Sequence, residues 1–318
     1  MSKPVLAIGE ILIDMIVSDG APSLEQAGAF ISRAGGAPAN AAVAIARLGL
    51  PVAFCGVCGD DPFGSRLRQV LIANNVDDTA LRSTIESDTT LAFAWKDAGG
   101  DGHFRLIRMA DCLLNAADVQ AKAQNAAVLI AGSVALSAEP SKSAVELAIE
   151  LASQAGVPIC LDLNVRPTLW PRLEDLQSAL APLLPKTTLL KLSLDDAGHL
   201  YGAGKTAERV FGRAREIGIP FVVLTDGARG CWYSDATGNP NYLPAFKIEA
   251  VEPTGAGDAF TAAIISRLLA NGWSGISQSD AEYASAAGAL TAMRPGAMES
   301  LPTAREIEEF LANEDLAH

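Results

Sequence analysis

The second half of the chain alternates short apolar strands with helices, and this alternation limits the possible folds more than any other feature. Strands are expected over residues 128–131, 158–163, 188–192 and 221–225. Helices are expected between and after them, over residues 141–155, 173–184, 195–201 and 206–217. Such alternation is typical of a mostly parallel sheet with helices on both faces. In these sheets, ligands bind at the carboxyl ends of the strands.

The first half of the chain predicts a second group of strands. Segments 90–95 and 103–108 flank a loop at 97–102 that is rich in Gly and Asp, which is typical of a β-hairpin. The strand-like segments 11–17 and 29–33 belong with them. A small β-sheet, separate from the α/β core, is therefore expected.

Composition and charge exclude several classes of protein. The chain has 318 residues, of which 49% are apolar, and this is enough for a large buried core. Its net charge of −13 disfavours nucleic acids and acidic membranes as partners. No apolar run approaches membrane-spanning length, and the N-terminus leads into a strand without a signal-peptide core. Five scattered cysteines without a CxxC pair indicate a reducing cytoplasm.

The stretch 251–260, VEPTGAGDAF, predicts a turn that leads directly into a helix over residues 259–270. Gly255, Ala256 and Gly257 have almost no side chain, so their N–H groups can come close to a ligand. At a helix N-terminus, such donors and the helix dipole form an anion site. Asp258 has two interpretations. It is either a helix cap or a base beside the anion site, which suits phosphoryl transfer to a hydroxyl.

Other polar residues also have two interpretations. Asp14 is either a solvent-facing carboxylate at a strand end or a hydroxyl-binding group. Asn40 follows Gly35 and Gly36 and either caps a helix over residues 41–48 or binds a ligand. Arg166 forms an ion pair at a strand end or contacts a ligand. Further candidates lie at or just after the ends of the predicted strands: Asp162, Asn164, Lys191, Ser193, Thr225, Asp226 and Gly227.

Two common motifs are excluded. Segment 202–206, GAGKT, resembles the end of a P-loop, but it lacks the first glycine and follows a helix, so we interpret it as a helix-ending loop. The chain has no GxGxxG motif, and its three histidines leave little for a histidine-rich metal site or a Ser-His triad.

Two segments together resemble the signatures of the ribokinase-like (PfkB) carbohydrate kinases: GGAPAN at 35–40 and PTGAGD at 253–258. The similarity extends across nearly the whole chain. Segments 9–14, 59–64, 110–114 and 162–166 also resemble the fructokinase branch. The resemblance implies one domain over residues 1–318, with a three-layer α/β/α core and a β lid. The lid strands would be inserted at about 11–34 and 89–110.

The resemblance also implies an activity and its partners. The γ-phosphoryl group of ATP would be transferred to a sugar hydroxyl, with Mg²⁺ and often K⁺ as cofactors. Fructose is the expected acceptor, giving fructose 6-phosphate. The alternative is a 2-keto-3-deoxygluconate kinase, followed by a nucleoside kinase or a non-catalytic sugar-binding relative. A homodimer joined through the lids is expected.

Each matching residue then has an implied role. Asp258 would be the base, and Gly255, Ala256 and Gly257 the anion hole. Sugar hydroxyls would be held by Asp14, Gly35, Gly36 and Asn40, with Arg108 closing over them from the lid and Arg166 near the sugar or the transferred phosphate. The nucleotide would be bound by Lys191, Ser193, Thr225, Gly227, Gly230 and Gly257.

The metal sites depart from the family pattern. Asp196 stands where the family has Glu, so it would reach Mg²⁺ through water. A monovalent cation would be bound by Glu252, Thr254, Thr291, Gly296 and Ser300. The family usually has Asp-Thr where this chain has Glu252-Pro253. Since proline already stiffens this turn, weak activation by K⁺ is predicted.

Overall fold

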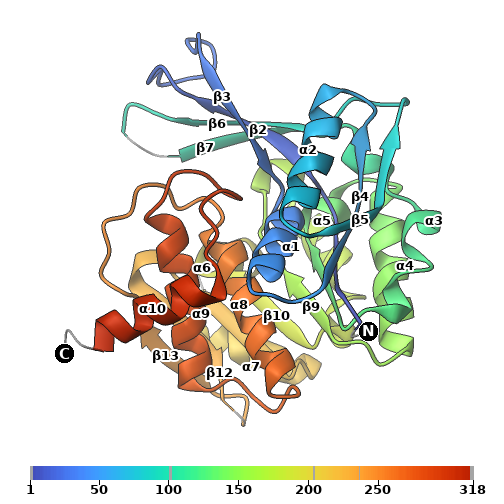
Figure 1. Cartoon of the computed structure of the whole chain (residues 1–318). Coiled ribbons are helices and arrows are strands. Elements are labelled where there is room, and N and C mark those ends of the chain that lie inside the picture. The colour runs from blue at the N-terminus through green and yellow to red at the C-terminus, as the bar shows by residue number, and fades with distance from the viewer. Residues whose placement is uncertain (1–2, 100–101, 203–204, 236, 316–318) are drawn as a thin grey trace.

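The computed structural model describes residues 3–99, 102–202, 205–235 and 237–315 (Figure 1). In these residues, nine strands form the main sheet, in the order β13-β12-β11-β10-β9-β8-β1-β4-β5. Their bounds are β1 (Val5–Ile8), β4 (Val52–Gly59), β5 (Asp77–Thr84), β8 (Val128–Gly132), β9 (Ile159–Asp162), β10 (Leu189–Ser193), β11 (Phe221–Thr225), β12 (Gly230–Ser234) and β13 (Pro240–Pro244). Only the pairs β11–β12 and β12–β13 are antiparallel. The predicted mostly parallel sheet is confirmed.

Helices cover both faces of this sheet, because successive side chains of a strand point to opposite faces. Val5 and Ala7 of β1 pack into one core, and Leu6 and Ile8 pack into the other. The first core includes α1 (Ala37–Arg47), α2 (Pro62–Ala73), α8 (Ala256–Ala270), α9 (Gln278–Ala292) and α10 (Ala304–Asp315). The second includes α3 (Ala116–Val119), α4 (Ser141–Gln154), α5 (Leu173–Leu180), α6 (Leu194–Tyr201) and α7 (Ala207–Ile217). The three-layer α/β/α core is confirmed.

A second sheet of four strands projects beyond one end of the main sheet (Figure 1). It consists of β2 (Leu12–Val17), β3 (Phe30–Gly35), β6 (Leu91–Lys96) and β7 (Gly102–Ile107), in the order β3-β2-β6-β7. We call it the lid. Strands β2 and β6 are parallel, and the other neighbours are antiparallel. The expected β6–β7 hairpin is confirmed, although residues 100–101 of its loop lie outside the described residues.

Two helices begin earlier than the sequence predicted. Helix α1 begins at Ala37 rather than at residue 41, and α8 begins at Ala256 rather than at residue 259. Glycines with positive φ, Gly36 (106°) and Gly255 (84°), occupy the N-cap positions. Asn40 and Asp258 therefore lie inside the helices, so the helix-cap interpretation is wrong for both.

Other segments agree only in part. Strands β5, β12 and β13 were not predicted. Helix α6 ends before Gly202, which has a φ of 64°, and residues 203–204 of the P-loop-like segment lie outside the described residues. No helix in the described ranges is both long enough and apolar enough to span a bilayer.

Candidate active site

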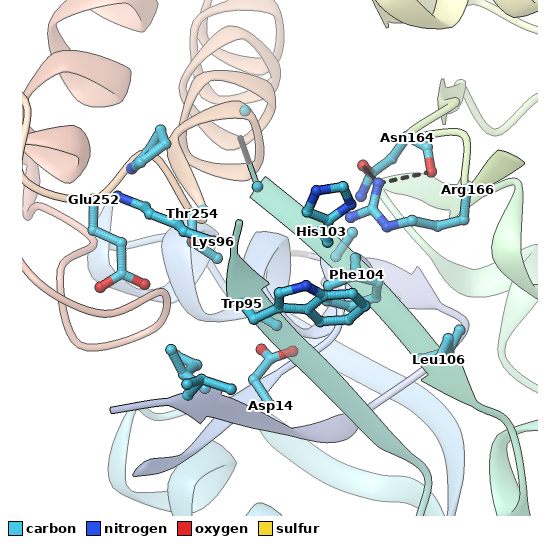
Figure 2. Close-up of a pocket in the computed structure, with 18 of the residues that line it drawn as sticks. Asp14, Trp95, Lys96, His103, Phe104, Leu106, Asn164, Arg166, Glu252 and Thr254 are labelled. Atoms are coloured by element: carbon cyan, nitrogen blue, oxygen red, sulfur yellow. Dashed lines mark hydrogen bonds between the residues drawn. The ribbon is translucent and has the colours of Figure 1, made fainter. Parts of the chain in front are cut away.

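A cavity of about 1220 Å³ lies between the lid, the N-terminus of α8 and the carboxyl ends of the central strands. Figure 2 shows Asp14 on the lid, Arg166 beyond the end of β9 and Glu252 before α8 around the same space. Of the predicted site residues, the following line the cavity: Asp14, Gly36, Asn40, Arg166, Lys191, Glu252, Thr254, Gly255, Gly257 and Asp258.

The N-terminus of α8 offers free hydrogen-bond donors to this cavity. The N–H group of Ala256 donates a hydrogen bond of 3.1 Å to Pro253 O, and this bond closes the turn. The N–H groups of Gly255, Gly257 and Asp258 have no acceptor among the described residues. Together with the helix dipole, these three groups are suited to bind an anion. The predicted set of donors therefore changes: Asp258 replaces Ala256.

Asp258 lies directly beside these donors. The residue is only 8% exposed, and its Oδ2 accepts a hydrogen bond of 2.8 Å from Nδ2 of Asn40. Burial raises the pKa of Asp258 to about 7, and the nearby negative charge of Asp162 adds to the increase. A carboxylate with a pKa near neutrality is suited to accept a proton from a hydroxyl. Asn40 holds one oxygen, and Oδ1 remains for a substrate.

Asp14 and Gly35 are placed together by the lid. Asp14 lies on β2, and Gly35 lies on the neighbouring strand β3. A Cβ atom on Gly35 would collide with Oδ2 of Asp14, so only glycine leaves room for this carboxyl group. Burial raises the pKa of Asp14 to about 7, although the nearby Arg166 opposes this increase.

Glu10 is a cavity residue whose place the sequence did not reveal. Its Oε1 accepts a hydrogen bond of 3.3 Å from the N–H of Ala37, at the start of α1. Its Oε2 is buried and has no hydrogen-bond partner in the part of the chain that the structure describes. Burial raises the pKa of Glu10 to about 7. Gly36 lies against the backbone of Glu10, because a Cβ atom there would lie 2.5 Å from Glu10 O. No pattern in the sequence marks an unpaired buried carboxyl group.

Arg166 connects the core to the lid. Its guanidinium donates a hydrogen bond of 2.6 Å to Oδ1 of Asn164, drawn as a dashed line in Figure 2. It also lies 5.2 Å from the centre of the Phe104 ring on β7, which is a cation–π distance. The charge of Arg166 lowers the pKa values of Glu10, Asp14 and Asp258 against the effect of their burial. One cation thus faces three buried carboxyl groups.

The comparisons with known proteins follow this geometry. Residues 2–304 match the family model described as pfkB family carbohydrate kinase. The chain belongs to the pfkB family of carbohydrate kinases.

Three relatives of this pfkB kinase show how far the similarity extends. Fructokinase-1 of Oryza sativa subsp. japonica is 36% identical over 317 residues, which cover 98% of each chain. The structure of fructokinase with bound ATP from Xylella fastidiosa has a TM-score of 0.88 and 28% identity, over 99% of this chain and 100% of that one. A double mutant of fructokinase from Vibrio cholerae O395, in a form with fructose, ADP and potassium ion bound, has a TM-score of 0.85 and 29% identity. That match covers 97% of this chain and 98% of the other.

Arg108 lies apart from the cavity of this pfkB kinase. It follows the end of β7, where the chain turns toward the core. Its guanidinium forms an ion pair of 2.6 Å with Asp111 and donates to Val134 O at 2.8 Å and to Oγ of Ser137 at 2.7 Å. These partners hold the side chain in the protein. Arg108 does not line the cavity in this structure, and its expected closure over the sugar stays a prediction.

The expected nucleotide residues lie at the same edge of the main sheet but outside the cavity lining. Ser193 and Thr225 end β10 and β11, Gly227 lies between β11 and β12, and Gly230 begins β12. Gly230 also has a packing role, because a Cβ atom there would collide with Leu243 O on β13. Lys191 differs from these four, since it lines the cavity.

The fit of the metal residues is mixed. Oδ1 of Asp196 accepts from the N–H of Val165 at 2.7 Å, and Oδ2 accepts from the N–H of Ser193 at 2.8 Å. Asp196 thus completes a capping box of α6. Because both of its oxygens already accept hydrogen bonds, this arrangement fits contact with Mg²⁺ through water better than direct binding. Within the described residues, no cluster of three His, Cys, Asp or Glu side chains could hold a metal ion.

The expected cation loop is tied to the turn before α8 by the protein itself. Oε2 of Glu252 accepts a hydrogen bond of 2.9 Å from the N–H of Gly296. The hydroxyl of Thr291 donates to Ala287 O, and that of Ser300 donates to Gly296 O and Ala297 O. These hydroxyl groups keep their oxygen lone pairs for a cation, whereas Glu252 already has a protein donor.

Proposed function

We propose that this pfkB kinase is a fructokinase, which transfers the γ-phosphoryl group of ATP to fructose and releases ADP and fructose 6-phosphate. One observation carries the proposal: the free N–H donors at the start of α8 and the buried carboxyl of Asp258 border the same cavity. The names of the relatives from rice, Xylella and Vibrio support fructose and ATP as substrates.

The proposed reaction needs one proton acceptor and one anion site. Oδ1 of Asp258 accepts the proton of the attacking hydroxyl, while Asn40 holds Oδ2 in place. The hydroxyl oxygen forms a bond to the γ-phosphorus, and the bond between that phosphorus and the oxygen of ADP breaks. The N–H groups of Gly255, Gly257 and Asp258 stabilise the negative charge on the phosphoryl oxygens.

The two substrates occupy different parts of the site in this proposal. Fructose lies under the lid, where Asp14 and Asn40 bind its hydroxyls, Gly35 and Gly36 leave space, and Arg166 lies near the transferred group. ATP extends over the ends of β10 and β11, where Lys191, Ser193, Thr225, Gly227 and Gly230 border it. Asp196 would hold the Mg²⁺ of Mg–ATP through water, and that ion would supply neutralisation of the phosphate charge.

A coupled assay of ADP release tests the substrate. The acceptors are fructose, ribose, 2-keto-3-deoxygluconate and nucleosides, each at several concentrations with Mg–ATP. The highest kcat/KM is expected for fructose, and the product should be identified as the 6-phosphate by mass spectrometry and NMR. Faster turnover of another acceptor, or ADP release that does not depend on any sugar, would contradict the proposal.

We further propose that two copies form a homodimer through their lids. Phe30 and Phe93 contact each other edge to face on the lid, with ring centres 5.7 Å apart. Ile107 on β7 is 42% exposed. Light scattering after size exclusion should give a dimer for the wild type and a monomer for Phe93→Glu. The control is Ile85→Glu, since Ile85 is 90% exposed but lies outside the lid strands. A dimeric Phe93→Glu would contradict this interface.

The compartment that we propose is the cytoplasm. Free thiols suit a reducing compartment, and all five cysteines are free: Cys55, Cys58, Cys112, Cys160 and Cys231.

A further inference from the structure

Beneath the anion site, three buried side chains from three elements form a connected group. Nζ of Lys191, on β10, lies 3.0 Å from Oδ1 of Asp162, which is on β9. Oδ2 of Asp162 accepts a hydrogen bond of 2.6 Å from the hydroxyl of Thr261, on α8. All three residues are buried. We call this group the Asp162–Lys191–Thr261 triad.

The triad is attached to the helix turn that provides the anion site. Oγ1 of Thr261 also lies 3.0 Å from Gly257 O, one turn earlier in α8. On the other side, a Cβ atom on Gly257 would lie 3.1 Å from Nζ of Lys191. The ammonium therefore lies against Gly257, and both residues line the cavity.

Lys191 is placed to act on a ligand rather than only to pair with Asp162. An ammonium group has three N–H donors. One is used by Asp162, and the described residues offer Lys191 no second hydrogen-bond acceptor. Burial acts to lower the pKa of Lys191, but the carboxylates of Asp162, Asp196 and Asp258 outweigh it and raise the pKa. A permanently charged donor thus remains beside the anion site.

The position of Asp162 requires an explanation, because a buried carboxylate near an anion site would repel the anion. The charge of Lys191 lies between the two and removes this conflict. We propose that Asp162 and Thr261 are positioning residues, which hold the Lys191 ammonium against Gly257 so that it binds the phosphoryl group in transit. This inference rests on the proposed kinase activity and adds the residues that position one of its cations.

The test uses isosteric changes in the full-length protein. Thr261→Val removes the hydroxyl and keeps the shape, and Thr261→Ser keeps the hydroxyl. Asp162→Asn keeps the shape and removes the charge.

We expect kcat to fall on the order of 10- to 100-fold in Asp162→Asn, since small misplacements of a catalytic cation are costly. It should fall about tenfold in Thr261→Val, as for a lost hydrogen bond to a charged group. Thr261→Ser should stay near the wild type, and the KM for the sugar should change little in all three.

The pH profile separates positioning from a merely structural role. The negative charge of Asp162 raises the pKa values of both Asp258 and Lys191. Asp162→Asn should therefore move the acid and alkaline limbs of kcat/KM to lower pH together. Asn40, Lys191, Arg166 and Asp14 also face Asp258, while Asp196 and Asp258 face Lys191. These groups are unchanged in the variant, so the shift reports Asp162 alone.

Calorimetric titration of ATP without sugar gives a readout that is independent of the acceptor. ATP should bind more weakly to Asp162→Asn and Thr261→Val, and normally to Thr261→Ser. If the wild type binds ATP but does not phosphorylate fructose, the proposed function fails while this comparison still tests the triad. Equal kcat for Thr261→Val and Thr261→Ser, or unmoved pH limbs with unchanged ATP binding in Asp162→Asn, would overturn the inference.

Discussion

At the scale of single residues, a comparison of Asp258 with Asp280 distinguishes a candidate base from a helix-capping residue. Each is the third residue of its helix, and both are buried. Asp280 completes a capping box with Ser277, whereas Asp258 accepts a hydrogen bond from Asn40.

We predict that Asp258→Asn lowers kcat on the order of 10²-fold or more with a nearly unchanged sugar KM, because the amide keeps the shape but not the basicity. Steady-state ADP release measures this. Asp280→Asn is the matched control and should keep its turnover; near-normal turnover of Asp258→Asn would mean that this carboxyl is not the base.

Asp14 and Gly35 give a second prediction at this scale. Asp14→Ala should raise the sugar KM strongly and leave ATP affinity almost unchanged, because Asp14 is assigned to the acceptor side. Gly35→Ala should have the same effect, since its Cβ would displace the Asp14 carboxyl. Gly212→Ala in α7 is the control, because a Cβ there meets nothing within 4 Å. Both KM values are measured, and a parallel loss of sugar and ATP affinity in Asp14→Ala would contradict the assignment.

Residue types predicted some of this site and could not predict the rest. Asp14 and Asp258 were candidates because carboxylates among apolar or small residues need an explanation. Glu10 lies four residues before Asp14, and the sequence does not show that its Oε2 is buried and unpaired. Arg108 was assigned by resemblance alone. Its ion pair with Asp111 depends on how the chain turns after β7.

At the scale of elements, the sequence predicted central strands better than helix starts and edge strands. Fully buried strands are mostly apolar runs, as in β9, where only the last residue, Asp162, is polar. The early start of α1 was missed because Ala37-Pro38 after two glycines is typical of a loop, yet proline is favourable in a first helical turn. Strand β5 is at the sheet edge, and its polar sequence DDTALRST carries little apolar periodicity.

The turn before α8 and the loop at 294–300 give a prediction about K⁺. Glu252 bonds to Gly296, and Pro253 stiffens the same turn, so the two elements are joined without an ion. Proline lowers the conformational entropy of the disordered turn, and this favours the ordered turn by ~0.4–1 kcal/mol. Such a free energy changes the population of the ordered turn only a few-fold. We therefore predict activation by K⁺ of under about tenfold.

Turnover in Tris buffer with and without KCl, at matched ionic strength, measures this activation. Pro253→Thr should depend more strongly on K⁺ than the wild type does. An absolute requirement for K⁺ in the wild type would show that the ion orders the turn and that proline does not replace it.

At the scale of the whole molecule, the sequence predicted which segments would meet but not how. The parallel sheet brings the ends of β9, β10 and β11 to one edge, as the alternation of strands and helices predicts. The bond between Asn40 and Asp258 joins segments 218 residues apart, and only the packing of α1 on α8 makes it. The cavity depends on the angle between lid and core, and local sequence patterns carry no information on such an angle.

The cavity also sets the pH dependence of the stability of the whole molecule. Glu10, Asp14 and Asp258 each have a pKa near 7 because burial penalises their charged forms. A carboxyl group with a raised pKa in the folded state stabilises the fold below its unfolded pKa, near 4, and this contribution is lost as the pH rises through about 7. The free energy of unfolding should therefore fall between about pH 4 and pH 7 and level off above that.

Asp258→Asn tests this dependence, because it removes one of the three groups. It should raise the free energy of unfolding at pH 8 by on the order of 1–3 kcal/mol, and by less at pH 5. Urea denaturation at both pH values measures the change. Asp280 is the opposite case, since its bonds to Arg267 and Ser277 outweigh its burial and lower its pKa. Asp280→Asn should therefore destabilise the fold at pH 8. If Asp258→Asn is less stable than the wild type at pH 8, the hydrogen bond from Asn40 outweighs the cost of burial. Asp258 would then stabilise the fold at this pH instead of destabilising it.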